Sequence, residues 1–292
     1  MSSTRSAPSS SGGAMRASIA RTVTRTPEVM VKISGWSRDM ASIKRAASYQ
    51  SQAKGRDAVI EDEHGALYSG RGCEHDVVAG WSRGVLGPPI PSEASPVPRQ
   101  GDRHAMNLVL SMPAGTPIDA VTGAARAFGE AEFGDRHAYF FTAHDDTDHA
   151  HVHMTVRLTG HDGSRLKHKI PDLARWRGTF ARELRERGVA ANATPRRARW
   201  VEARSVPQPV YHARTGRGES PRPALREATD DQGRVLGQGA RETYRTVRDA
   251  LERSADPADQ QLARAITDYA EPQRERAVSR EQDTGADIDV DP

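Results

Sequence analysis

The chain has 292 residues, of which 36% are hydrophobic and 5% aromatic, with 18 Pro and 25 Gly. This low apolar content excludes a single hydrophobic core that includes the whole chain. We therefore expect a folded part of roughly 180 residues with flexible ends. The formal net charge is only +3, and the single cysteine, Cys73, excludes an internal disulfide and a zinc finger. No apolar run reaches the roughly 18 residues of a membrane span, so we expect a cytoplasmic protein without membrane insertion.

The N-terminal third combines a polar leader with short elements. Residues 1–28 are rich in Ser, Thr and Arg with almost no acid, which is typical of a disordered leader. Apolar residues recur at helical spacing on the next segment, at Met40, Ile43 and Ala47. The expected elements are a strand at 29–34, a helix at 37–53, a hairpin over 58–68, a short helix at 74–81 and a proline-rich loop at 87–100.

The central third alternates further strands and helices. Apolar runs and helical stripes predict a strand at 106–112, a helix at 117–132, strands at 137–143 and 151–158, and a helix at 170–187 that ends at Gly188. This order predicts an α+β fold, with a central antiparallel β-sheet and helices packed on one face. We expect residues 29–204 to form this domain and residues 205–292 to form a linker, two short helices (239–254 and 257–270) and an acidic tail.

Residues 144–153 hold four of the 11 histidines and three aspartates. From His151 onward, polar and apolar residues alternate strictly, so His151 and His153 should project from the open face of a strand. If residues 145–150 form a hairpin loop, His144 lies directly opposite His151, about 5 Å away on the same face. The pattern therefore predicts a metal site at His144, His151 and His153; the alternative is an ordinary polar hairpin.

A three-histidine site leaves coordination positions open for a substrate, which indicates catalysis. The basic stretch that follows, residues 161–204, has twelve Lys or Arg against five Asp or Glu, and such a stretch favours a polyanionic substrate. Together these features suit metal-assisted chemistry on a phosphate ester. Either water or a side chain can be the attacking group, and only a side chain gives a covalent intermediate.

The motif His-x-Asp-x-x-His-x-His-Val-His resembles the third motif of conjugative relaxases, the HUH group of single-strand endonucleases. The plasmid-mobilisation (MOBP-like) and T-DNA border type is the nearest class. Three further stretches resemble relaxase motifs in the same order, over about residues 29–200: Lys32-Ile-Ser-Gly with Ala47-Ser-Tyr-Gln50, Leu108-Val-Leu-Ser-Met-Pro-Ala-Gly-Thr116, and Asp172-Leu-Ala-Arg-Trp-Arg-Gly-Thr-Phe-Ala181 with Leu184-Arg-Glu-Arg-Gly188.

The resemblance implies a tyrosine nucleophile near the N-terminus, and Tyr49 fits this role. Tyr49 lies about 150° around its helix from the apolar stripe, so it should face outward. The helix at 170–187 has no tyrosine, whereas replication initiators, which share the histidine pair, carry theirs on such a downstream helix. The implied activity is site- and strand-specific nicking of single-stranded origin-of-transfer DNA. It would use Mg²⁺ or Mn²⁺ and leave a 5′-phosphotyrosine and a free 3′-OH.

The remaining site residues follow from the same resemblance. Asp146 would either accept the phenolic proton or orient a histidine, and we favour the second role. Relaxosome accessory proteins and a type IV secretion coupling protein would be partners, and the bacterial protein can be translocated with its DNA. Candidate DNA contacts are Lys32, His149, Arg165, Lys167, Lys169, Arg175 and Arg177.

Two alternatives remain from the sequence. One is a hydrolytic metal-dependent single-strand nuclease that forms no covalent intermediate. The other is a non-catalytic DNA-binding relaxosome accessory protein. A cupin-type oxygenase is disfavoured by the basic stretch and by the absence of a glycine-rich barrel pattern.

Overall fold

A computed structural model describes residues 10–51, 58–82, 88–95, 102–199 and 238–284. The chain divides into two compact units: Pro27–Ala193 form one, and Met1–Thr26 with Thr194–Pro292 form the other. Residues 205–237, where we expected the linker, lie outside the described residues, as does part of the expected proline-rich loop. The histidine motif belongs to the unit Pro27–Ala193.

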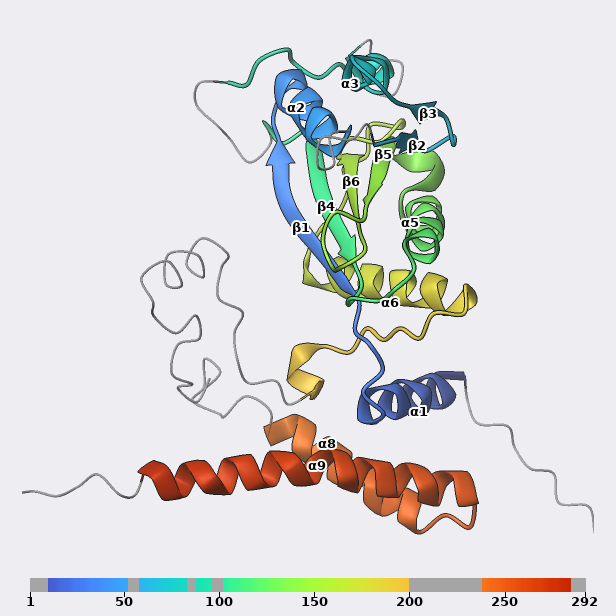
Figure 1. Ribbon diagram of the computed structural model, residues 1–292, viewed down its shortest axis with the longest axis vertical. Helices are drawn as coiled ribbons and strands as arrows, with labels where there is room; N and C mark the ends of the chain where they lie inside the picture. The colour runs from blue at the N-terminus through green and yellow to red at the C-terminus, as the bar shows by residue number, and fades with distance from the viewer. Residues whose placement is uncertain (1–9, 52–57, 83–87, 96–101, 200–237, 285–292) are drawn as a thin grey trace, which may run out of the picture. The chain divides into compact units, whose positions relative to one another are not determined.

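This unit is built on a six-stranded sheet in the order β1-β4-β6-β5-β2-β3, in which every neighbouring pair is antiparallel (Figure 1). The expected α+β fold with a central antiparallel sheet is confirmed. The strands are β1 (Met30–Ser37), β2 (Ile60–Asp62), β3 (Leu67–Tyr68), β4 (Ala105–Ser111), β5 (Tyr139–His144) and β6 (His151–Arg157).

One face of the sheet carries the main hydrophobic core. Val152, Met154 and Val156 alternate along β6 and are fully buried there, as the period-two pattern predicts. Two long helices, α5 (Ile118–Glu132) and α6 (Ile170–Glu186), cover this face, and a 3₁₀ turn, η3 (Gly134–Arg136), follows α5. The buried side of α5 includes Val121, Ala125 and Phe128, at the spacing of an amphipathic helix.

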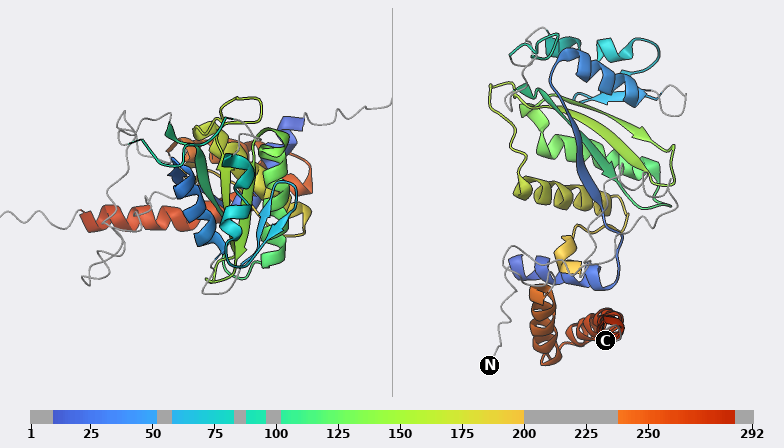
Figure 2. Two further views of the ribbon diagram at one scale, coloured as in Figure 1. Left: turned by 90° about the horizontal axis from the view of Figure 1, so that it is seen from above. Right: turned by 90° about the vertical axis from the view of Figure 1, so that its left-hand side faces the viewer.

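The opposite face is covered in part by helix α2 (Met40–Ser51), which Figure 2 shows on the other side of the sheet from α5. Its buried stripe of Met40, Ile43 and Ala47 packs in a second core with Ile60 and Phe140. Two short helices, α3 (Cys73–Asp76) and α4 (Ala79–Ser82), replace the single helix expected at 74–81. The turn between them is stabilised by burial, because both of its valines, residues 77 and 78, belong to this core.

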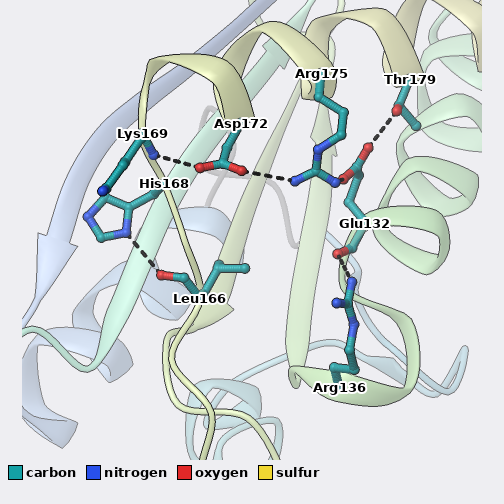
Figure 3. A network of polar contacts seen from close by, with 8 residues as sticks. All are labelled: Glu132, Arg136, Leu166, His168, Lys169, Asp172, Arg175 and Thr179. Atoms are coloured by element: carbon teal, nitrogen blue, oxygen red, sulfur yellow. Dashed lines mark hydrogen bonds and ion pairs between the residues drawn. The ribbon is translucent and has the colours of Figure 1, made fainter.

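Helices α5 and α6 are joined by a polar network around Glu132 (Figure 3). The buried Glu132 carboxylate accepts hydrogen bonds from Arg175 Nη1 at 2.5 Å and from Thr179 Oγ1 at 2.5 Å. Arg136 Nη2 donates to the Glu132 carbonyl at 3.1 Å. The carboxylate charge is therefore compensated by an arginine that sequence analysis assigned to DNA.

The described part of the second unit contains four helical elements. They are α1 (Ser10–Val23), η4 (Arg196–Arg199), α8 (Gln238–Glu252) and α9 (Pro257–Thr284). Their core consists of Val23, Tyr244, Leu262, Ile266 and Tyr269. Helix α1 lies within the segment expected as a leader. Helix α8 agrees with the expected helix at 239–254, whereas α9 begins at the expected residue 257 but continues beyond residue 270 to Thr284, into the segment expected as a tail. In the described part of the chain, no helix combines the length and apolar character needed to cross a membrane.

Candidate active site

Three histidines converge on the face of the sheet opposite the main core. Strands β5 and β6 pair His144 directly with His151, as the hairpin hypothesis predicts. The ring centroids of His144, His151 and His153 lie 4.8 to 5.4 Å apart. Each ring offers one nitrogen, and these three atoms all lie within 4.8 Å of one another. The set can therefore surround a single ion.

Hydrogen bonds to backbone carbonyls determine which ring nitrogen of His144 and of His151 remains available to bind a metal ion. His144 Nε2 donates to the Gln50 carbonyl at 2.8 Å, and His151 Nδ1 donates to the His149 carbonyl at 2.9 Å. In the neutral rings, Nδ1 of His144 and Nε2 of His151 are then the lone-pair nitrogens. Burial, together with the neighbouring His144 and His151, lowers the pKa of His153 to about 4, although Asp146 acts in the opposite direction. His153 is therefore unprotonated at neutral pH, as a metal ligand must be.

Asp146 lies beside the open nitrogen of His151. Its Oδ1 is 3.7 Å from His151 Nε2, and this buried oxygen has no hydrogen-bond partner among the described residues. The His149 carbonyl already holds the other nitrogen of the same ring. A backbone carbonyl thus orients the His151 ring, which is the role that we expected for Asp146. The Asp146 carboxylate instead faces the histidine cluster.

Tyr49 lies next to the histidines. Its ring centroid is 5.5 Å from that of His153, edge-on at an interplanar angle of 89°, and 6.5 Å from that of His144. Its side chain is 67% exposed, as its place on the helix predicts. The last turn of α2 therefore presents a reachable phenol beside the three imidazoles.

Gln50 fixes this last turn to the sheet, a role that sequence analysis missed. Its carbonyl accepts from His144, and its side-chain Nε2 donates to Thr155 Oγ1 at 2.8 Å. The Thr155 hydroxyl in turn donates to Asn107 Oδ1 at 3.0 Å. One signal was visible in the sequence: Gln50 extends the buried stripe of Ile43 and Ala47 by one helical step, and a polar residue in such a position needs partners.

The expected DNA contacts do not all lie near this cluster. Lys32 is exposed on β1, and the register Lys32–Val109–His153 places it on the face of the histidines, two strands away. The side chain of His149 is exposed in the hairpin loop.

The remaining candidates belong to the α6 region. Arg165 donates to the Arg103 carbonyl, and Arg175 is paired with Glu132. Arg177 is half-buried and has no ion pair among the described residues. Lys167 and Lys169 precede α6 and are exposed.

The comparisons with known proteins agree with this geometry. Residues 92–189 match the family described as "Relaxase: MobA/VirD2-like, nuclease domain", and this match includes all three histidines. This part of the chain is therefore similar to the nuclease domain of relaxases. Nucleases of this family generally depend on a metal ion, in keeping with the histidine cluster.

A T-DNA border endonuclease, VirD2 of Agrobacterium fabrum, is 28% identical over 129 residues, which cover 41% of this chain and 29% of that protein. The chain thus matches less than a third of the length of this relative. No solved structure matches the chain.

Proposed function

We propose that this domain nicks single-stranded DNA by transesterification, with Tyr49 as the nucleophile. The observation that carries the proposal is the position of an exposed phenol, 67% accessible, beside three imidazoles that share one face of the sheet. The relaxase-type domain supports the same activity. A hydrolytic nuclease would need no such tyrosine.

The residues fit a divalent cation such as Mg²⁺ or Mn²⁺. His144, His151 and His153 would hold it, and the buried Oδ1 of Asp146 supplies a hard oxygen beside His151 Nε2. We therefore assign Asp146 to the cation site. The bound cation would neutralise charge that develops on the phosphate oxygens.

The reaction exchanges one phosphate ester for another. The Tyr49 oxygen forms a bond to phosphorus as the bond to the 3′ oxygen breaks, and the departing oxygen takes up a proton. The phenolic proton of Tyr49 leaves to solvent, to which this exposed side chain has access. The products are a 5′-phosphotyrosine and a free 3′-OH, and attack by a 3′-OH on this ester rejoins the strand without ATP.

The wider role that we propose is the transfer of a plasmid or another mobile element. The substrate would be origin-of-transfer DNA, with relaxosome accessory proteins and a type IV secretion coupling protein as partners in the bacterial cytoplasm. Translocation with the DNA into a recipient cell belongs to the same proposal. The relaxase-type domain and the likeness to a T-DNA border endonuclease support it.

The test is the intact mass of the protein after incubation with Mn²⁺ and a pool of randomised single-stranded oligonucleotides labelled at the 3′ end. We expect a labelled covalent adduct that is lost in Tyr49→Phe. Tyr68→Phe is the matched control, because the Tyr68 hydroxyl donates to Asp62 in the β2–β3 hairpin. Cleavage that persists in Tyr49→Phe without an adduct would show a hydrolytic nuclease. Binding without cleavage by the wild type would show a non-catalytic DNA-binding protein.

A further inference from the structure

Cations and aromatic rings gather around Trp36, near the end of strand β1. The Arg103 guanidinium lies over the indole, with Cζ 4.5 Å from the ring centroid. The His168 ring lies on the same indole, with centroids 4.7 Å apart. Arg165 Nη2 donates to the Arg103 carbonyl at 2.6 Å, which draws the segment before α6 into this cluster. None of these contacts involves the histidine site.

A β-bulge turns Trp36 toward this cluster. Strand β1 is the edge strand of the sheet, and its register with β4 shifts between Ile33 and Gly35. A bulge of one residue re-aims the side chains that follow it. Lys32, before the bulge, lies on the face of the histidines, whereas Trp36, after it, packs against the main core on the opposite face. A ligand that passes over this edge would therefore meet both side chains.

The segment before α6 adds a row of exposed cations. Arg165, Lys167 and Lys169 are exposed and alternate with the half-buried Leu166 and His168. Figure 3 shows His168 and Lys169 next to each other, with the Lys169 backbone amide donating to Asp172 at the start of α6. In extended chain, alternate residues lie about 6.6 Å apart, similar to the spacing of successive phosphates in an extended DNA strand.

Arg103 and Lys167 contribute positive charge to this cluster. In the described part of the chain, no carboxylate forms an ion pair with Arg103 or Lys167, and Arg103 Nε is buried without a hydrogen-bond partner. Burial lowers the pKa of His104 nearby, and the charge of Arg165 also lowers it, against the smaller opposite effects of Asp102 and Asp39. A neutral His104 leaves the arginines and lysines as the source of the positive potential. An anion with flat apolar groups fits such a surface.

The cluster lies within reach of DNA held at the histidines. Trp36 pairs with Met106, which pairs with Val156, three residues along β6 from His153. Two strand spacings and three residue steps place the Trp36 and His153 backbones roughly 14 Å apart. A few nucleotides of single-stranded DNA span this distance.

We propose that this surface is a second binding site for single-stranded DNA, and this rests on the proposed function for its substrate class. Bases stack on the Trp36–Arg103–His168 group, and phosphates contact the cation row, so that a flanking part of the strand is held over the β1 edge. Stacking and phosphate contacts tolerate any sequence, and this site therefore contributes affinity without sequence readout.

The test measures fluorescence anisotropy of labelled single-stranded oligonucleotides of increasing length, in EDTA, so that neither metal nor cleavage is needed. We expect Trp36→Leu to bind the long oligonucleotides roughly 5- to 100-fold more weakly than the wild type. We expect Lys167→Gln to reduce the slope of log affinity against log salt by about 0.7, the value for one phosphate contact on a single strand. Arg71→Gln is the control, because Arg71 is exposed beyond strand β3 at the other edge of the sheet.

Lys167→Gln keeps the test decisive if Trp36→Leu fails to melt like the wild type. Wild-type affinity and salt slope in Lys167→Gln, or a loss no larger than that of Arg71→Gln, would overturn the proposed site. Binding that depends on Lys167 while the wild type forms no tyrosine adduct would support this site and reject the proposed chemistry. An adduct that forms while Lys167→Gln binds normally would support the proposed chemistry and reject this site.

Discussion

Tyr49 stands edge-on to His153, with ring centroids 5.5 Å apart, although the two residues come from a helix and a strand that are distant in sequence. The contact exists because the carbonyl of the next residue, Gln50, accepts a hydrogen bond from His144. The same helical turn therefore positions the phenol and holds one of the imidazoles. Changes at this turn should affect the chemistry before they affect the fold.

Thr155→Val should slow adduct formation. The Thr155 hydroxyl links Gln50 to Asn107, and its loss leaves the buried Gln50 amide without this acceptor. We expect a loss of about 1–3 kcal/mol in the free energy of unfolding and, because small misplacements of a nucleophile are costly, an adduct rate reduced by about tenfold or more. Denaturant titration and single-turnover kinetics measure the two effects.

Thr142→Val is the matched control for this change. Thr142 pairs with His153 across the hairpin, but its buried hydroxyl makes no hydrogen bond in the described structure. The Thr142→Val variant should therefore keep a free energy of unfolding and a rate of adduct formation near the wild-type values. Equal losses in the two variants would show that the Gln50–Thr155 link does not position Tyr49.

Mn²⁺ binding should require His153 and not His149. Calorimetric titration of the wild type should show one site, which His153→Ala weakens at least tenfold because one of three imidazoles is lost. His149→Ala should bind normally, because this residue contributes only its carbonyl, to His151. The cluster would not be the metal site if both variants bound Mn²⁺ like the wild type.

Glu132→Gln should destabilise the fold by about 2–3 kcal/mol, because it removes the buried carboxylate to which both Arg175 and Thr179 donate hydrogen bonds. Glu130→Gln on the same helix is the control, since Glu130 is exposed. Chemical denaturation gives both values. Similar stability in the two variants would mean that the network does not join α5 to α6.

Two glycine substitutions should change stability in opposite directions. A Cβ at Gly129 would lie 2.6 Å from the Tyr139 ring, whereas a Cβ at Gly178 would meet nothing within 4 Å. Gly178→Ala should raise the melting temperature, since alanine favours a helix by about 1 kcal/mol over glycine. Gly129→Ala should lower it, because α5 must move away from the sheet. A stabilised Gly129→Ala would contradict the close packing of α5 on Tyr139.

Stability should fall as the pH drops below about 6.5, in part because of His137. Burial lowers the pKa of this imidazole. A hydrogen bond with the Arg157 carbonyl raises the pKa, but burial is the larger effect. The unfolded chain then binds a proton that the folded chain rejects, so the contribution is complete above pH 6.5 and is lost on acidification. Urea titrations at pH 7.5 and 5.5 should show a smaller difference for His137→Asn than for the wild type.

His64→Gln is the control for this prediction, because His64 is exposed. Its difference between the two pH values should equal that of the wild type. His104 and His153 also have lowered pKa values, so His137→Asn should retain part of the dependence. An unchanged difference in His137→Asn would exclude this residue as a contributor.

The sequence by itself determined the elements and the faces on which their side chains lie. Alternation along 151–157 placed His151 and His153 on one side of a strand, and the short gap to His144 fixed the hairpin register. The helical stripe of α2 likewise predicted an exposed Tyr49. These features depend on periodicities of 2 and 3.6 residues, which are local and therefore readable without a structure.

Only the tertiary structure decided which distant groups meet. It brought Gln50 to His144, paired Arg175 with Glu132 instead of leaving it for DNA, and set Asp146 on the open side of His151. It also turned Trp36 at the bulge toward Arg103 and His168. Such contacts follow from how helices and strands pack across long sequence separations, and residue order alone does not encode a partner for a single buried hydrogen bond or charge.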